Sequence, residues 1–165
     1  MQISLASQIV RAAEKRTDLE VDALLSDARP WLYRLALAIT ARPDAAEDVT
    51  QDALVRAARS REKLRTVAEP RAWLRTVVVR CAITSLSKMP SASPLDCTID
   101  ADPTEALAVH QTLSRLIPAD RVLLALVHFE ELSYAEIGEV LEIPVGTVAS
   151  RLHAAREAFR KEWRK

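Results

Sequence analysis

The sequence predicts an all-α protein built from two small helical domains that are joined by a flexible linker. Glycine occupies only two of the 165 positions, and alanine, leucine, arginine and glutamate dominate the chain. No stretch alternates apolar and polar residues for long, so helix is the expected state nearly everywhere. A proline-rich segment without apolar periodicity divides the helical sequence. We therefore expect a helical domain over residues 1–88, a linker over 89–103 and a second helical domain over 104–165.

The composition and the absence of known motifs argue against several classes of function. No apolar run is long enough to span a bilayer and the first residues lack a signal-peptide cleavage pattern, so we expect a cytoplasmic protein without membrane insertion. Cys81 and Cys97 lie far apart, and the three histidines lack ligand spacing, so we expect no metal site and no cofactor. No catalytic triad, paired-carboxylate or glycine-rich phosphate motif appears. We therefore expect neither an enzyme nor a small-molecule substrate.

The net charge of the whole chain is zero, but its charges are segregated. Residues 53–90 hold nine lysines and arginines against two acids, and residues 145–165 hold six against two. Residues 1–52 balance at −3 and residues 91–144 at −8. This alternation is typical of a protein that touches DNA at two places and presents acidic surfaces to another partner.

The first domain shows three helical patterns in order. A helix is expected through Asp22–Ser26, and Pro30 should interrupt or kink it before an apolar stripe over residues 31–39. The residues 44–47 (DAAE) have the form of a capping box, which predicts the start of the next helix. A third helix should begin near Pro70, a proline acceptable in a first turn, and run towards Leu86.

The second domain should open at residues 102–105 (DPTE), where an N-cap aspartate, a first-turn proline and an N3 glutamate coincide. A very apolar helix over residues 122–129 follows. Residues 133–136 (SYAE) form a second capping box, for a helix that should end near Leu141. The last helix should begin after Pro144.

The segment 133–156 has the pattern of a helix-turn-helix. We expect four apolar residues of its first helix to face inward: Tyr134, Ile137, Val140 and Leu141. Those of its second helix are Val148, Leu152, Ala155 and Phe159. The opposite face presents short polar groups and long cations: Thr147, Ser150, Arg151, His153, Ala154 and Arg156. Such a face suits the major groove of DNA, although an amphipathic hairpin that only packs would share the pattern.

A longer string makes a family resemblance explicit. Residues 132–141 (LSYAEIGEVL), 143–148 (IPVGTV) and 150–153 (SRLH) closely resemble the fourth conserved region of extracytoplasmic-function sigma factors. A second block resembles that family's second region in the expected order: WLYRLAL at 31–37, AEDVTQD at 46–52 and RAWL at 71–74. The resemblance implies two helical domains and promoter recognition as a subunit of RNA polymerase.

For the acidic helix, the resemblance implies contact with the clamp helices of the largest subunit of the polymerase core. The residues concerned are Asp44, Glu47, Asp48, Gln51 and Asp52. Four carboxylates, no cation and one amide fit such a contact. The other interpretation is that an acidic first turn merely complements the helix dipole.

For the basic segment, the resemblance implies contact with the −10 element and with single-stranded bases after melting. The residues concerned are Arg56, Arg59, Arg71, Arg75, Thr76 and Arg80. The sequence departs from the family here, because Ala58 stands in place of a common tryptophan, and Val79 and the arginines stand where aromatic or amide groups are frequent. Stacking on flipped bases should be poorer, while phosphate contacts stay available. Trp73 is expected in the core, on the same face as Val77.

For the last helix, the resemblance implies contact with the −35 element through Thr147, Ser150, Arg151, His153 and Arg156. Ala149 replaces a usual lysine or arginine, which puts one phosphate or base contact in doubt.

Three functions compete at this point. The first is a working initiation factor whose partners are the RNA polymerase core and promoter DNA, and the sequence leaves open whether an anti-sigma factor is a further partner. The second is a sigma-like decoy that binds an anti-sigma factor or polymerase without reading promoters, favoured by the missing aromatics and Ala149. The third is an ordinary repressor, which would not need the acidic motif. The basic second domain favours the working factor.

Overall fold

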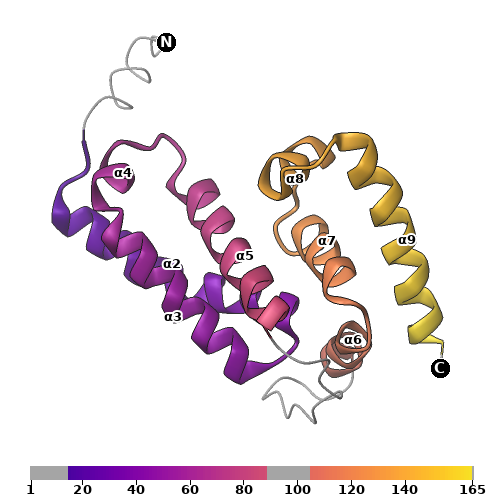
Figure 1. The fold of residues 1–165 in the computed structure, drawn as a ribbon. Coiled ribbons are helices and arrows are strands. Elements are labelled where there is room, and N and C mark those ends of the chain that lie inside the picture. The colour runs from indigo at the N-terminus through magenta and orange to yellow at the C-terminus, as the bar shows by residue number, and fades with distance from the viewer. Residues whose placement is uncertain (1–14, 89–104, 165) are drawn as a thin grey trace, which may run out of the picture.

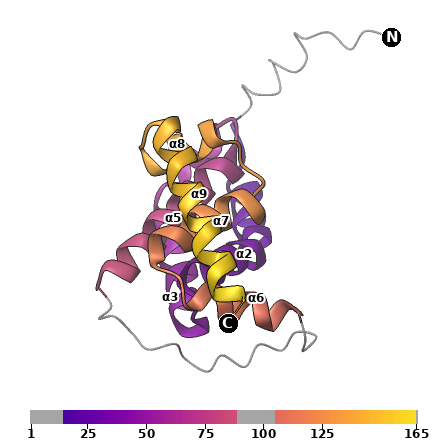
Figure 2. The same ribbon diagram turned by 90° about the vertical axis from the view of Figure 1, so that its right-hand side faces the viewer.

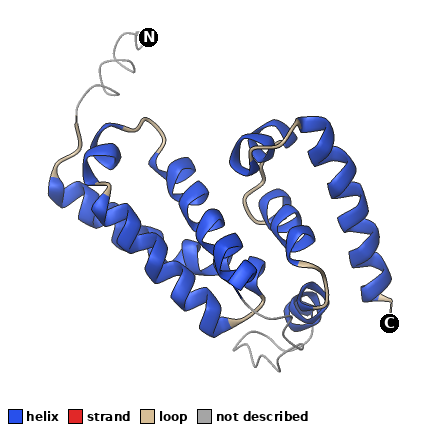
Figure 3. Cartoon of the chain, viewed as in Figure 1, coloured by secondary structure: helices blue, strands red, loops and turns tan. Residues whose placement is uncertain are grey.

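The computed structural model describes residues 15–88 and 105–164, and their regular elements are all helices (Figures 1 and 3). They follow one another as α2 (Asp18–Thr40), α3 (Pro43–Arg59), α4 (Arg61–Thr66), α5 (Pro70–Lys88), α6 (Glu105–Ser114), α7 (Pro118–His128), α8 (Tyr134–Leu141) and α9 (Val145–Trp163). None of these helices is long and apolar enough to cross a membrane. The expected all-α fold is confirmed.

Helix α2 is longer than the sequence pattern predicts. It begins at a capping box, in which the Thr17 side chain accepts from the Glu20 backbone N–H and the Glu20 carboxylate accepts from the Thr17 backbone N–H. The expected interruption at Pro30 is wrong, because the helix continues to Thr40. The Pro30 ring lies on the exposed side. Buried Ala28 and Leu32 lie on either side of it in the chain, so packing outweighs the one hydrogen bond that proline cannot donate.

Helix α3 begins two residues earlier than a capping box at Asp44 and Glu47 would place it, and that predicted capping box is wrong. The N-cap is Arg42, which makes no side-chain cap, and Pro43 occupies the first turn. The Asp44 carboxylate instead accepts from Arg42 Nη2 at 2.6 Å. Glu47 pairs with Arg29 of α2. Because the helix starts before Asp44, neither carboxylate caps it, and each binds an arginine.

The core of the first domain lies between α2, α3 and α5, which pack on one another (Figure 1). Helix α5 begins at Pro70 as predicted. Its Leu74 and Val78 are buried together with Leu32, Leu35 and Ile39 of α2. Burying each such leucine side chain contributes about 1.5–3 kcal/mol. This packing fixes which faces of α3 and α5 remain outward.

The second domain is built on α7, whose residues 121–126 are all buried. The apolar run ends earlier than predicted, since α7 stops at His128 and Phe129 is half exposed. Helices α8 and α9 pack on one side of α7. The predicted N-cap at Asp102 lies outside the described residues, as does the predicted linker over 89–103.

The two helical groups contact each other. Helix α7 packs on α2 and α5 on one side and on α9 on the other, and Figure 1 shows it between them. In Figure 2, which is viewed from the side of α9, that helix lies in front of α7. Buried apolar residues of both groups form one continuous cluster. A hydrogen bond from Arg121 Nε to the Ile39 carbonyl oxygen, 2.7 Å long, joins α7 to the end of α2.

Candidate protein and nucleic-acid interfaces

One outward face of α3 carries the predicted acidic residues. Its buried residues (Ala45, Ala46, Val49, Thr50, Ala53 and Ala57) point to α2 and α5. The opposite side presents what we call the acidic stripe: Asp44, Glu47, Asp48, Gln51 and Asp52. All five lie on one face because they are spaced three and four residues apart. Asp48 and Gln51 are exposed, and Asp48 makes no ion pair with another residue in the described part of the chain.

The ends of the acidic stripe are held as carboxylates by arginines. Hydrogen bonding from Arg42 lowers the pKa of Asp44. The Arg56 guanidinium, 3.0 Å away, lowers the pKa of Asp52. Beneath the stripe, burial raises the pKa of the Cys81 thiol to about 11, and a hydrogen bond with Asp52 adds to this. At neutral pH the carboxylates of Asp44 and Asp52 therefore stay ionised and the Cys81 thiol stays protonated.

The predicted −10 residues do not form one open face. Arg56 pairs with Asp52, while Arg59 is exposed at the end of α3. The Thr76 hydroxyl donates to the Ala72 carbonyl oxygen of its own helix. The three arginines of α5 (Arg71, Arg75 and Arg80) all point to acids of the second domain: the first two to Glu130 and the third to Glu142.

The aromatic residues near α5 behave as structural groups. Trp73 is partly buried against the core as predicted, and the ammonium group of Lys63 lies 6.0 Å from its ring centroid. The Arg71 guanidinium stacks on Trp31, 4.8 Å from the ring centroid. Such cation–π contacts fix the arginine and cover the tryptophan face.

The helix-turn-helix is confirmed in α8 and α9. Ser133 and Glu136 form the predicted capping box, with the Glu136 carboxylate accepting from the Ser133 backbone N–H at 2.8 Å. These hydrogen bonds lower the pKa of Glu136. The turn is tight, because the backbone N–H of Ile143 donates to the Gly138 carbonyl oxygen at 3.0 Å. A Cβ atom on Gly138 would lie only 2.8 Å from the Ile143 carbonyl oxygen, so glycine is required here for space.

Helix α9 has the two faces that the sequence predicts. Val148, Leu152 and Ala155 are completely buried. The predicted −35 residues lie on the rest of the helix surface: Ser150, Arg151 and His153 exposed, Thr147 and Arg156 partly so. We call these five residues the recognition face. They are brought together on one helix, which a groove-reading element requires.

Of the two aromatic positions in the motif, one differs from expectation. Tyr134 is exposed rather than inward, and its hydroxyl accepts from Arg156 Nη1 at 3.3 Å. Phe159 is only partly buried and stacks on Trp163, with ring centroids 5.8 Å apart. The prediction that Tyr134 faces inward is wrong, because an aromatic ring in a first helical turn can pack at the rim and keep its hydroxyl in water. Phe159 packs against the core as predicted, with one side left open.

Several residues that hold the structure together carry no local motif. Arg121 and Glu130 bond across the two helical groups to partners far away in the sequence. Arg16 donates from Nη1 to the carbonyl oxygens of Leu64 and Val67. The sequence analysis also missed the start of α2, although the T-x-x-E spacing of Thr17 and Glu20 is that of a capping box.

Comparison with known proteins assigns these features to a family. The sigma-70 region 2 model matches residues 24–89, and the sigma-70 region 4 model matches residues 106–159. The ECF RNA polymerase sigma factor SigL of Mycobacterium tuberculosis is 33% identical over 153 residues, which cover 84% of this chain and 85% of SigL. SigW of Bacillus subtilis, also an ECF RNA polymerase sigma factor, is 29% identical over 157 residues, covering 81% of this chain and 83% of SigW.

A solved structure shares the fold. It is the sigma factor RpoE in complex with the anti-sigma factor NepR from Bartonella quintana, with a TM-score of 0.74 and 19% sequence identity over 88% of this chain and 97% of that chain. The acidic stripe lies within the region 2 match and the recognition face within the region 4 match. The chain therefore belongs to the extracytoplasmic-function sigma factors of the sigma-70 family.

Proposed function

We propose that this chain brings the RNA polymerase core to promoters and starts transcription there, as a non-enzymatic subunit acting in the cytoplasm. The observation that carries this proposal is the pairing of two outward surfaces on one chain. The acidic stripe on α3 offers carboxylates to a basic partner protein, and the recognition face on α9 offers cations and hydroxyls to DNA. In this proposal residues 1–88 bind core and the −10 element, and residues 104–165 bind the −35 element.

Run-off transcription with purified core polymerase on a library of promoter fragments tests the proposal. We expect specific transcripts that depend on the added chain. Core binding without transcripts from any fragment would favour the decoy, which the lack of an aromatic side chain at the partly exposed Ala58 supports. Val79 is completely buried and is not available to stack on a base. DNA binding without core binding would favour a repressor.

The first prediction concerns the acidic stripe. Asp48→Lys combined with Gln51→Ala should weaken core binding by about tenfold or more, because a cation replaces an exposed carboxylate in a charge-matched interface. A pull-down with titrated core polymerase measures the change. Asp27→Lys, an equal charge reversal at an exposed position of α2, is the control. Equal binding by both variants would contradict the role of the stripe.

The second prediction concerns the recognition face. If Arg151 reads a guanine in bidentate fashion, Arg151→Ala should cost about 1–3 kcal/mol and relax preference at one base pair. Arg156→Ala, which removes a phosphate contact, should weaken all sequences alike and reduce the salt slope by about one. Binding to matched and scrambled −35 duplexes across a salt series separates the two effects. Arg115→Ala, at an exposed position outside α8 and α9, is the control.

The third prediction concerns Ala149, which is exposed beside the recognition face. Ala149→Lys should tighten binding to promoter duplex, with the largest gain at low salt, because an added cation releases one more counterion from DNA. The same salt series measures this gain. A lysine that changes neither affinity nor salt slope would show that position 149 does not approach DNA.

A further inference from the structure

A short helix joins two of the residues proposed for the −10 element. Helix α4 and the loop 67–69 connect Arg59, at the end of α3, to Arg71, in the first turn of α5. Helix α4 has six residues. Isolated helices shorter than about 12–15 residues are marginal in water, so tertiary contacts must hold this segment in one conformation.

Arg16 provides such contacts at the C-terminal end of α4. Its Nη1 donates to the Leu64 carbonyl oxygen at 3.0 Å and to the Val67 carbonyl oxygen at 2.8 Å. Its backbone N–H donates to the Arg65 carbonyl oxygen at 3.0 Å. The last carbonyl groups of a helix have no partner within the helix and form the negative end of its dipole. Arg16 therefore caps α4 from a position 48 residues earlier in the chain than Leu64.

The start of α2 fixes the position of Arg16. Arg16 directly precedes Thr17, the N-cap residue of α2. The backbone N–H and the hydroxyl of Thr17 both donate to the Glu20 carboxylate, at 2.7 Å and 2.9 Å. These hydrogen bonds lower the pKa of Glu20, so the carboxylate stays ionised and the cap persists at neutral pH.

Two aspartates of α2 also contact α4. Asp18 Oδ2 lies 2.7 Å from Arg65 Nη2, and Asp22 pairs with Arg61. All four side chains are partly or largely exposed, so these ion pairs add orientation more than stability. Figure 1 shows α4 beside the start of α2, and the two helices are in contact. The first turns of α2 and the whole of α4 thus form one connected unit.

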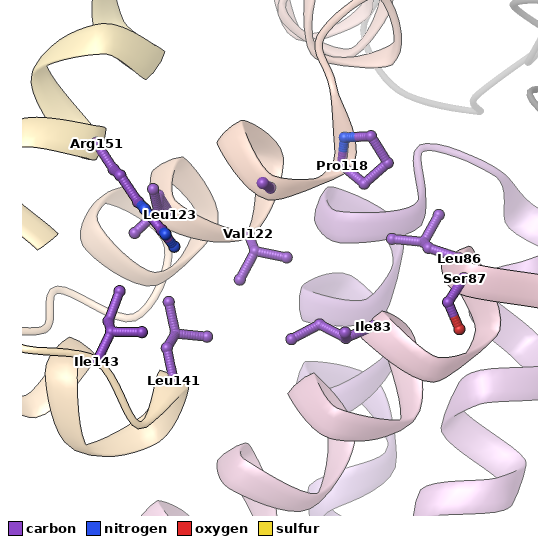
Figure 4. Close-up of a pocket in the computed structure, with 10 residues that line it drawn as sticks. Ile83, Leu86, Ser87, Pro118, Val122, Leu123, Leu141, Ile143 and Arg151 are labelled. Atoms are coloured by element: carbon purple, nitrogen blue, oxygen red, sulfur yellow. The ribbon is translucent and has the colours of Figure 1, made fainter. Parts of the chain in front are cut away.

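The other end of α5 is positioned by different contacts. Ile83 and Leu86 line a groove of about 400 Å³, across from Val122 and Leu141 of the second domain, as Figure 4 shows. Among the described residues that line this groove, none belongs to α4 or to the loop 67–69. This contact with the second domain therefore leaves α4 to be held from within the first.

We propose that Arg16 is a positioning residue for the −10 element, which holds α4 and the loop 67–69 in one conformation so that Arg59 and Arg71 are already in place when the DNA strand binds. This inference rests on the proposed function, because it takes −10 DNA as the ligand of these two arginines. Binding that must first order a segment loses conformational entropy, whereas a segment that is already held does not. Arg16 acts through α4 and makes no contact with DNA of its own.

Arg16→Met, which removes the donors of this side chain, tests the proposal in the complex with core polymerase. The variant should bind a promoter fork that exposes the −10 strand about five- to tenfold more weakly than the natural chain. Its affinities for core polymerase and for −35 duplex should not change. The matched control is Lys15→Met, which removes the same charge from the exposed preceding residue and should change none of the three affinities. Equal losses in both variants, or no loss in Arg16→Met, would overturn the proposal.

Two further measurements separate positioning from direct contact with DNA. Loss of a phosphate contact would reduce the salt slope of fork binding by about one, whereas loss of positioning lowers affinity equally at every salt concentration. Arg16→Lys should recover most of the lost affinity, because both side-chain hydrogen bonds come from one nitrogen and an ammonium group has three donors. A reduced salt slope in Arg16→Met, or a lysine variant that binds no better than the methionine variant, would overturn the proposal.

Hydrogen exchange of the free chain tests the effect on α4 without DNA. The backbone N–H groups of Leu64 and Val67 donate to the carbonyl oxygens of Ser60 and Lys63, at 3.1 Å and 2.8 Å. Both should exchange faster in Arg16→Met, while the amides of α3 should exchange as in the natural chain. Unchanged exchange in α4 would overturn the proposal.

Failure of this inference can be distinguished from failure of the proposed function. Absence of transcription by the natural chain on every promoter fragment would count against the initiation role. Normal transcription by the natural chain, together with equally tight fork binding by Arg16→Met, would overturn the positioning role alone.

Discussion

Arg121→Met should lower the free energy of unfolding by about 3–5 kcal/mol, because several buried carbonyl oxygens would lose their donor. The Arg121 side chain is buried in α7, and burial lowers its pKa. Its Nε donates to Ile39, and its Nη1 donates to Leu116 at 3.0 Å and Ser114 at 3.3 Å. Methionine fills similar space but donates nothing. Chemical denaturation followed by circular dichroism measures the loss.

Arg115→Met is the matched control for this prediction. Arg115 lies just after α6 and is exposed, so its loss should change stability by no more than about 0.5 kcal/mol. If the two variants unfold at the same denaturant concentration, the prediction is contradicted. The carbonyl oxygens around Arg121 would then find other donors, and the guanidinium hydrogen bonds would not stabilise the fold.

Gly138→Ala and Gly146→Ala should change stability in opposite directions. A Cβ atom at Gly138 would meet the Ile143 backbone at 2.8 Å and force the helix-turn-helix open, which should cost about 1–3 kcal/mol. A Cβ atom at Gly146 would meet nothing within 4 Å, and alanine there should stabilise the chain by about 0.4–1 kcal/mol. Thermal unfolding of the two variants measures the difference.

The same pair of variants links stability to function. Gly138→Ala should also weaken binding to −35 duplex, because the turn sets the angle between α8 and α9, whereas Gly146→Ala should leave folding intact. A stable Gly138→Ala variant with normal DNA binding would show that the Ile143 carbonyl can move aside at no cost.

The sequence predicted those parts of the fold that are governed by short-range patterns. The capping box at Ser133 and Glu136 and the helix start at Pro70 depend on residues within one turn, and both are confirmed. The buried stripe of α9 follows from helical periodicity alone. Patterns of this kind predict an element because the partners of each group lie nearby in the chain.

Predictions failed where a tertiary contact competes with a local one. Asp44 and Glu47 have capping-box spacing, but Arg42 and Arg29 bind their carboxylates instead. Pro30 should break a helix, yet packing on both sides of it keeps α2 continuous. No local pattern indicates which partner wins such a competition.

The contact between the domains could not be predicted for the same reason. Glu130 and Arg75 are 55 residues apart, and neither stands in a recognisable spacing with the other. The charge balance predicted which segments are acidic and which are basic, but it predicted an outside partner for the acidic surfaces and no ion pairs between the segments. The assignment of site residues to polymerase and DNA stays a prediction until the experiments above are done.

The protonation state of Cys81, which lies beneath the acidic stripe, determines how readily its thiol reacts with oxidants. Peroxides and alkylating agents attack the thiolate, and a pKa of about 11 leaves only about one thiol in ten thousand ionised at pH 7. Burial in the core limits access further. Cys81 should therefore resist sulfenylation under oxidative stress, and the acidic stripe above it would keep its shape while more reactive cysteines elsewhere in the cell are being oxidised.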